Sequence, residues 1–203
     1  MTHLRYIVAG DSIMSYAYEQ GDVCGDASKL AASLIPTMID VSICNFSGPG
    51  QRMCSGGIPG FGLTNQKTAI TYINGGKNAD GIILAVGVND WGAPEVGAIE
   101  FINTYRDFIR FCQAQGMKVV VSLPVWNNEE LMRKPHVDGY CTLVEFRHYA
   151  AQVAYAEGAN VFITDCIGLK AEHFVDGLHL NAKGHTVWAS ALVSQMGEWG
   201  LWP

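Results

Sequence analysis

The amino-acid sequence predicts an α/β protein, a three-layer α/β/α sandwich around a five-stranded parallel sheet. The first observation is that short apolar, β-rich runs alternate with longer helix-like segments along the 203-residue chain. The second is that these runs are continuously apolar, as expected for strands of a parallel sheet that is covered on both faces. Because strand and helix alternate in order, the helices can connect successive parallel strands and form the two outer layers.

Five apolar runs are predicted to form the strands. The first ends abruptly in Gly10-Asp11-Ser12, which places a serine at the tip of a buried strand close to the start of the chain. In chain order the predicted strands are Tyr6–Ala9, Val41–Cys44, Gly81–Val86, Lys118–Leu123 and Asn160–Thr164.

Helices are predicted between and after these strands. The clearest covers Val96–Gln115, where apolar residues recur at steps of three and four along one face. Pro36 is expected to end or kink the helix near Ser28–Met38, and Asn181 is a suitable N-cap for the last helix. The remaining helices are predicted near Thr64–Asn74, Tyr140–Glu157 and Ala182–Trp199.

The chain, residues 1–203, is predicted to form a single domain, since it shows no internal repeat, linker or low-complexity stretch. Two loops exceed ordinary connection length, residues 46–63 and residues 124–139. Each follows the carboxyl end of a predicted strand, the edge at which open parallel sheets bind ligands. We therefore expect these loops to contact a substrate.

Charge and composition limit the class of partner. Thirteen Lys and Arg against nineteen Asp and Glu give a net charge of −6, which disfavours nucleic acid and anionic membrane surfaces. No apolar run approaches the roughly 18 residues of a membrane span, and no secretion signal is visible, so the protein is expected in the cytoplasm unless a signal was removed. No Cys-x-x-Cys pair or matching histidine pair forms a zinc pattern, so no metal or cofactor is predicted.

Four short motifs fall at the same edge of the predicted sheet. Each motif alone has a simpler explanation, such as a helix cap, a turn or a loop pair. Together they contain the parts that acyl transfer requires: a serine, a base, an acid that orients the base, and donors for an oxyanion. The motifs are Gly10-Asp11-Ser12, Asn45 to Gly50, Gly87-Val88-Asn89-Asp90 and Asp176-Gly177-Leu178-His179.

The chemistry assigns a role to each part. Ser12 is the candidate nucleophile, and because a serine hydroxyl is a weak nucleophile near neutral pH, it needs an adjacent base. His179 is the candidate base, and Asp176 would fix its tautomer and stabilise the imidazolium, with Asp165 as an alternative acid. The oxyanion is expected to bind the backbone N–H groups of Ser12 and Gly50 and the side-chain amide of Asn89.

The four motifs, in this order, resemble the four sequence blocks of the SGNH hydrolases, also called the GDSL esterase/lipase family. The resemblance extends from residue 10 to residue 179, with Ile13 in place of the leucine of the family's name. It implies a flavodoxin-like SGNH hydrolase fold and a serine esterase. Gly48 competes with Gly50 for the oxyanion role, and the family's five-residue spacing from Asn45 favours Gly50.

The expected activity is hydrolysis of a short-chain acyl ester, such as an acetyl ester, on a carbohydrate or other small alcohol, through an acyl-enzyme. Trp91 and Trp126 follow motifs at the sheet edge, so they are candidates for an aromatic rim against the substrate. The alternatives are a lysophospholipase-like or thioesterase-like acyl hydrolase, and a non-catalytic binding protein that retains the fold. The sequence does not predict an oligomeric state.

Overall fold

The apolar runs form a five-stranded parallel sheet with the strand order β4-β1-β5-β6-β7. The predicted α/β fold class is therefore confirmed, and the predicted strand boundaries are correct to within two residues. The strands are β1 (Leu4–Gly10), β4 (Val41–Asn45), β5 (Gly81–Ala85), β6 (Lys118–Ser122) and β7 (Asn160–Phe162).

The structure is a computed structural model, and it describes residues 3–19, 22–24, 27–54, 67, 70–71, 79–93, 95–138 and 140–202. The helix predicted near Thr64–Asn74 lies almost entirely outside the described residues. Within the described ranges, no helix is long and apolar enough to cross a bilayer.

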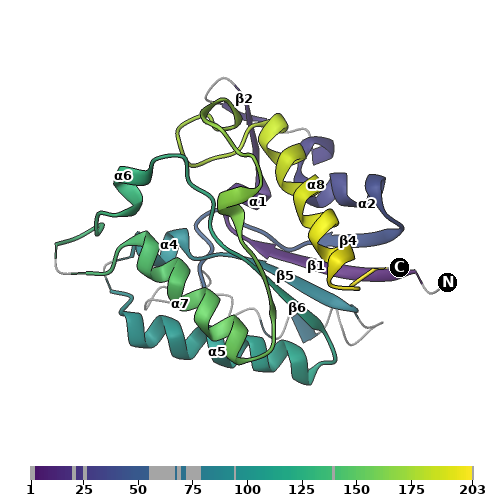
Figure 1. The fold of residues 1–203 in the computed structure, drawn as a ribbon, viewed down its shortest axis with the longest axis horizontal. Coiled ribbons are helices and arrows are strands. Elements are labelled where there is room, and N and C mark those ends of the chain that lie inside the picture. Colours follow the sequence, from purple (N-terminus) through teal and green to yellow (C-terminus); the bar gives the residue numbers. More distant parts are fainter. Residues whose placement is uncertain are drawn as a thin grey trace.

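Two pairs of helices cover the two faces of the sheet (Figure 1). Helices α2 (Ala31–Met38) and α8 (Ala182–Glu198) pack on one face, and α5 (Ala98–Ala114) and α7 (Leu143–Ala156) pack on the other. Successive strand residues point to opposite faces, so Ile7 lies in the core beneath α5 and α7. Its neighbours Tyr6 and Val8 lie in the core beneath α2 and α8.

The long helices agree with the sequence prediction. Asn181 caps α8, because its side-chain oxygen accepts a hydrogen bond from the backbone N–H of Gly184 at 3.0 Å. Pro36 lies inside the last turn of α2, and the helix ends two residues later at Met38. Helix α7 begins with a capping box in which Thr142 and Glu145 satisfy each other's backbone N–H groups.

Several short elements join the main ones, and most of them were not predicted. Helix α1 (Ser12–Ser15), a single turn, directly follows β1. Single turns and three-residue strands are too short to show a hydrophobic period. The others are the hairpin of β2 (Ala17–Glu19) and β3 (Asp22–Cys24), helices α4 (Val88–Trp91) and α6 (Glu129–Met132), and 3-10 turns η1 (Ala27–Lys29), η3 (Thr164–Cys166) and η4 (Ala171–His173).

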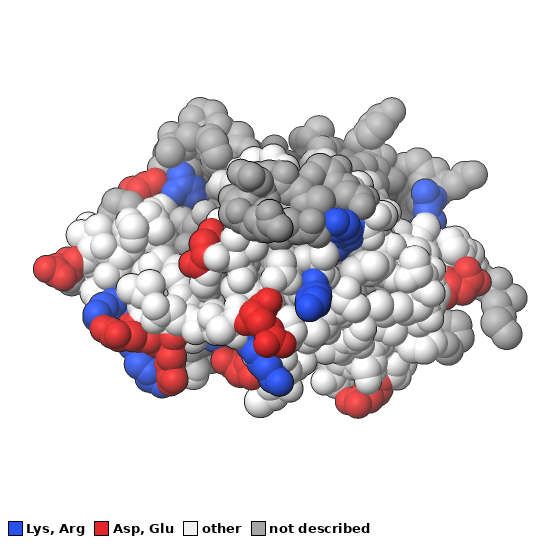
Figure 2. All heavy atoms as spheres, turned by 90° about the horizontal axis from the view of Figure 1, so that it is seen from above, with Lys and Arg blue, Asp and Glu red and all other residues white. Residues whose placement is uncertain are grey.

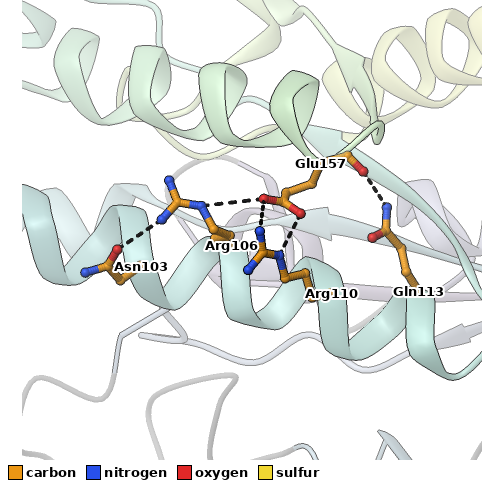
Figure 3. Close-up of polar contacts among 5 residues, drawn as sticks. All are labelled: Asn103, Arg106, Arg110, Gln113 and Glu157. Carbon is orange, nitrogen blue, oxygen red and sulfur yellow. Dashed lines mark hydrogen bonds and ion pairs between the residues drawn. The ribbon is translucent and has the colours of Figure 1, made fainter.

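A polar cluster fixes the end of α7 against α5 (Figure 3). The Glu157 carboxylate accepts two hydrogen bonds from Arg110, at 2.8 and 3.0 Å, and forms an ion pair with Arg106 at 3.5 Å. The Glu157 carbonyl accepts a further hydrogen bond from the Gln113 side chain at 2.7 Å. The cluster aligns the two helices. Because Arg110 is well exposed, its ion pair contributes little net stability.

A close approach between α8 and the chain before it requires Gly184. A Cβ atom at this position would lie 2.4 Å from the carbonyl oxygen of His173, which also accepts a hydrogen bond from Asn181 N at 3.0 Å. The start of α8 therefore holds both ends of the loop that runs from His173 to Asn181.

We predict that Gly184→Ala destabilises the protein by roughly 1–3 kcal/mol, although alanine is the better helix former, because the new methyl group overlaps backbone atoms that cannot move alone. Urea unfolding followed by circular dichroism measures the change. Ser190→Ala, at an exposed position of the same helix, is the control and should be near neutral. A Gly184→Ala variant at least as stable as the parent would contradict this packing.

Candidate active site

Ser12 lies at the end of β1, at the first residue of α1. The turn is formed by Asp11, whose carboxylate accepts a hydrogen bond from Ile13 N at 2.9 Å and so caps the helix. Gly10 permits the tight turn, since a Cβ atom there would lie 2.7 Å from the side chain of Met14. This local geometry leaves the Ser12 side chain half-buried at the carboxyl edge of the sheet.

His179 and Asp176 lie in the loop held by the start of α8. The loop closes with a hydrogen bond from Val175 N to the carbonyl of His179 at 3.0 Å, and Gly177 turns it with a φ of 85°. One oxygen of Asp176 accepts hydrogen bonds from the backbone N–H groups of Leu178 at 3.0 Å and His179 at 2.8 Å. The backbone of His179 thus holds Asp176 in place, and Asp176 in turn orients the His179 ring.

The three side chains form a continuous chain of hydrogen bonds. His179 Nε2 lies 2.9 Å from Ser12 Oγ, and His179 Nδ1 lies 2.7 Å from the second oxygen of Asp176. Burial alone would raise the pKa of Asp176, but the hydrogen bonds from His179 and Leu178 outweigh it and lower that pKa. The alternative acid, Asp165, pairs with Arg147 instead.

The three donors predicted for the oxyanion have no acceptor among the described residues. They are the backbone N–H groups of Ser12 and Gly50 and one hydrogen of the Asn89 amide, whose other hydrogen binds the Gln51 carbonyl at 2.9 Å. Gly50 has a φ of 71°, which glycine adopts without strain. The N–H of the competing Gly48 donates to the carbonyl of Gly10 at 3.1 Å, so it is occupied within the fold.

Asp90 anchors the loop that carries Gly50. The Asp90 side chain is fully buried, and its two oxygens accept hydrogen bonds from Met53 N and Cys54 N, both at 2.8 Å. From the sequence, Asp90 was only the last residue of the motif that contains Asn89. Its actual partners lie in another loop, and no sequence pattern pointed to them.

Asp11 and Asp90 are two buried carboxylates directly behind the site. Burial raises the pKa of Asp11 to about 7, although the Ile13 N–H hydrogen bond opposes this and the nearby Asp90 adds to it. Burial also raises the pKa of Asp90 to about 6, against the opposing effect of its backbone hydrogen bonds. Ionising the Asp11 and Asp90 carboxyl groups in the folded protein is therefore energetically costly.

The two tryptophans of the predicted rim lie together. Trp91 and Trp126 form an edge-to-face pair with ring centroids 5.2 Å apart, and His136 packs against Trp91 at 5.3 Å. The Trp91 indole N–H donates to the Lys134 carbonyl at 3.3 Å. The pair therefore joins α4 to the long loop after β6.

Charged groups form no extended basic surface on the face seen in Figure 2, where the described Lys and Arg lie in small groups with Asp and Glu or singly. Across the described residues, no cluster of three or more His, Cys, Asp or Glu could hold a metal ion.

Comparison with known proteins agrees with the fold, a three-layer α/β protein with a five-stranded parallel sheet. The chain belongs to the GDSL-like Lipase/Acylhydrolase family, whose model matches residues 8–187. No curated protein matches the sequence.

Solved structures share the fold at low sequence identity. An acetyl xylan esterase, AlAXEase, is 18% identical with a TM-score of 0.71, over 95% of this chain and 99% of that one. A lipase/acylhydrolase from Enterococcus faecalis is 18% identical with a TM-score of 0.69, over 95% of each chain. A mutant of Axe2, an acetyl-xylooligosaccharide esterase from Geobacillus, is 14% identical with a TM-score of 0.66, over 96% of this chain and 94% of that one.

The buried Asp11 predicts a stability that falls as pH rises. Because its pKa of about 7 in the folded protein exceeds the usual value of about 3.9, the folded state binds a proton that the unfolded state has already released. This stabilisation is complete below about pH 4 and is lost as pH rises through about 7.

Asp11→Asn removes this titration and keeps an oxygen that can accept the Ile13 N–H hydrogen bond. Its free energy of unfolding, measured by urea denaturation, should therefore decline less than that of the parent between about pH 4 and 7. Some decline remains, because Asp90 titrates in the same range. Asp107→Asn, at an exposed position, is the control. Parallel curves for Asp11→Asn and the parent would contradict the assignment.

Proposed function

We propose that the chain, as one catalytic domain, is a serine esterase that hydrolyses short-chain acyl esters through an acyl-enzyme on Ser12. The observation that carries this proposal is the hydrogen-bond chain from Ser12 through His179 to Asp176, at the edge of the sheet where β1 ends between β4 and β5. Membership of the acylhydrolase family supports the same class of reaction.

In the first half-reaction Ser12 Oγ attacks the ester carbonyl carbon while His179 Nε2 accepts the hydroxyl proton. Asp176 stabilises the resulting imidazolium and holds the ring so that Nε2 faces the serine. The tetrahedral intermediate then collapses, the bond to the alcohol oxygen breaks, and His179 returns the proton to the leaving alcohol. Ser12 is left as an acyl ester.

In the second half-reaction a water molecule replaces the alcohol. His179 Nε2 accepts a proton from the water as the water oxygen attacks the acyl carbon. The second tetrahedral intermediate then collapses, the bond from the acyl carbon to Ser12 Oγ breaks, and His179 gives the proton to Oγ. The products are the carboxylic acid and the free enzyme.

The negative oxygen of each tetrahedral intermediate would bind the N–H groups of Ser12 and Gly50 and the free hydrogen of the Asn89 amide. The bond from Asn89 to the Gln51 carbonyl orients this amide, and Asp90 holds the same loop two residues further on. These donors are fixed before the substrate binds, so little reorganisation is needed as charge develops.

An acetyl ester on a carbohydrate is the proposed substrate. The fold is shared with an acetyl xylan esterase and an acetyl-xylooligosaccharide esterase, and Trp91 of the Trp91–Trp126 pair lies in the same short helix as Asn89. The alternatives remain a lysophospholipase-like or thioesterase-like hydrolase and a non-catalytic binding protein.

Substitution of Ser12 tests its role as the nucleophile. The parent should hydrolyse p-nitrophenyl acetate faster than long-chain p-nitrophenyl esters, and Ser12→Ala should reduce the rate to near background without a change in melting temperature. Ser15→Ala, three residues further along the same turn, is the matched control and should remain active. Full activity in a folded Ser12→Ala variant would rule out this mechanism.

Substitution of Asn89 distinguishes oxyanion binding from structural support of its loop. Asn89→Ala removes a donor and should lower kcat by about 10²–10³ with little change in KM. Asn89→Asp should be at least as damaging, because it places an anion where an anion forms.

Asn45 provides the matched control for loop support, since its amide donates to the Met14 carbonyl at 3.2 Å and Asn45 has no proposed role toward substrate. Asn45→Ala should lower the melting temperature with a much smaller effect on kcat. If Asn89→Ala lost activity only in proportion to its unfolded fraction, its role would be that of a loop brace.

A further inference from the structure

A pocket of about 570 Å³ lies at the carboxyl ends of β6 and β7. Its described lining includes none of Ser12, Asp176 and His179, so it is distinct from the proposed catalytic centre. The loop after β6, helix α7 and the chain between η3 and η4 form its walls. A cavity of this size is in the range that binds small organic ligands.

The apolar part of the wall includes Trp126, Val144, Leu169 and Phe174. Among these, Trp126 supplies the only aromatic indole of the lining, and its partner in the edge-to-face pair is Trp91 of α4. The pocket is therefore linked through Trp126 and Trp91 to α4, the short helix that contains Asn89.

The polar part of the wall contains two pairs of opposite charges. Arg147, which is only 8% exposed, binds the Asp165 carboxylate, and Arg133 binds Glu129 at 2.8 Å. The positive and negative charges of these four side chains balance. Both N–H donors and carboxylate acceptors are thus available at one wall.

This combination discriminates between classes of ligand. A long acyl chain would place hydrocarbon against the Arg147–Asp165 pair, which is unfavourable for the polar groups. An anionic ligand would meet carboxylates as well as guanidinium groups. An uncharged sugar has apolar ring faces for Trp126 and hydroxyl groups that both donate and accept hydrogen bonds.

We propose that this pocket binds an uncharged sugar unit of the alcohol part of the substrate, at a distance from the ester group that reacts. The inference rests on the proposed esterase function and specifies its substrate as an oligosaccharide. The pocket also adjoins the catalytic loop, because Asn127 N donates to the carbonyl of Gly177 at 2.9 Å. Gly177 lies between Asp176 and His179.

Direct binding tests the proposal independently of turnover. Ser12→Ala protein labelled with ¹⁵N is titrated with short unacetylated xylo-oligosaccharides, and the expected result is chemical-shift change at the pocket lining, including the Trp126 indole. Ala151→Trp, in the lining on α7, should abolish these changes by filling the pocket. Gln152→Trp, the next residue of the same helix, is exposed and outside the lining, so it is the matched control.

Kinetics on the otherwise unaltered enzyme gives the second measurement. Ala151→Trp should raise KM for acetylated xylo-oligosaccharides by at least about 10-fold, equivalent to roughly 1.4 kcal/mol, and leave p-nitrophenyl acetate hydrolysis unchanged. If Ala151→Trp does not fold, His148→Trp, at an exposed lining position, replaces it.

The outcomes separate the two proposals. Two outcomes would overturn the pocket assignment and leave the esterase proposal intact. In one, the protein hydrolyses p-nitrophenyl acetate normally but binds no saccharide. In the other, Ala151→Trp and Gln152→Trp change saccharide binding equally. A preference for long acyl esters that is lost in Ala151→Trp would reassign the pocket to the acyl chain. Full esterase activity in Ser12→Ala would instead contradict the esterase proposal itself.

Discussion

The parallel pairing of β1 with both β4 and β5 is the constraint on which the rest of the structure depends. In this register Val8 lies opposite Asn45, and Gly10 lies opposite Ala85, so three strands end at one edge. The loops that follow them then supply Ser12, Gly50 and Asn89, which are far apart in the sequence. Burial enforces the register, since Gly81 approaches the Tyr6 ring so closely that a Cβ atom would lie 2.3 Å from it.

The site is built by loops that hold one another rather than by the sheet alone. Asn89 and Asp90, at the end of β5, bind the loop after β4 at Gln51, Met53 and Cys54. The start of α8 holds the loop of His179 in the same way. Burying the Asp11 and Asp90 carboxylates is costly to stability, and such cost is typical of sites whose groups must be fixed in advance.

The sequence predicted the fold well because the relevant signals are local. Continuous apolar runs marked the five strands, three- and four-residue periodicity marked α5, and helices were also predicted near the positions of α7 and α8. The motifs also identified the residues that the structure brings together, Ser12 with His179 and His179 with Asp176. The spacing from Asn45 favoured Gly50 over Gly48, and the fold adds a physical reason, since the Gly48 N–H already donates to the Gly10 carbonyl. Three other features depend on long-range packing, which no short sequence pattern encodes. They are the partners of Asp90, the contact between Trp91 and Trp126, and the pocket beside α7.

The central claim is that Ser12 is the residue that becomes covalently acylated, and covalent labelling tests it most directly. An organophosphonate should react with the serine and mimic the tetrahedral intermediate, with loss of its leaving group. Mass spectrometry of the intact protein and of its peptides should show one adduct, on the peptide that contains Ser12, together with loss of esterase activity. The adduct should be absent from Ser12→Ala. An adduct on another residue, with esterase activity retained by Ser12→Ala, would contradict the account.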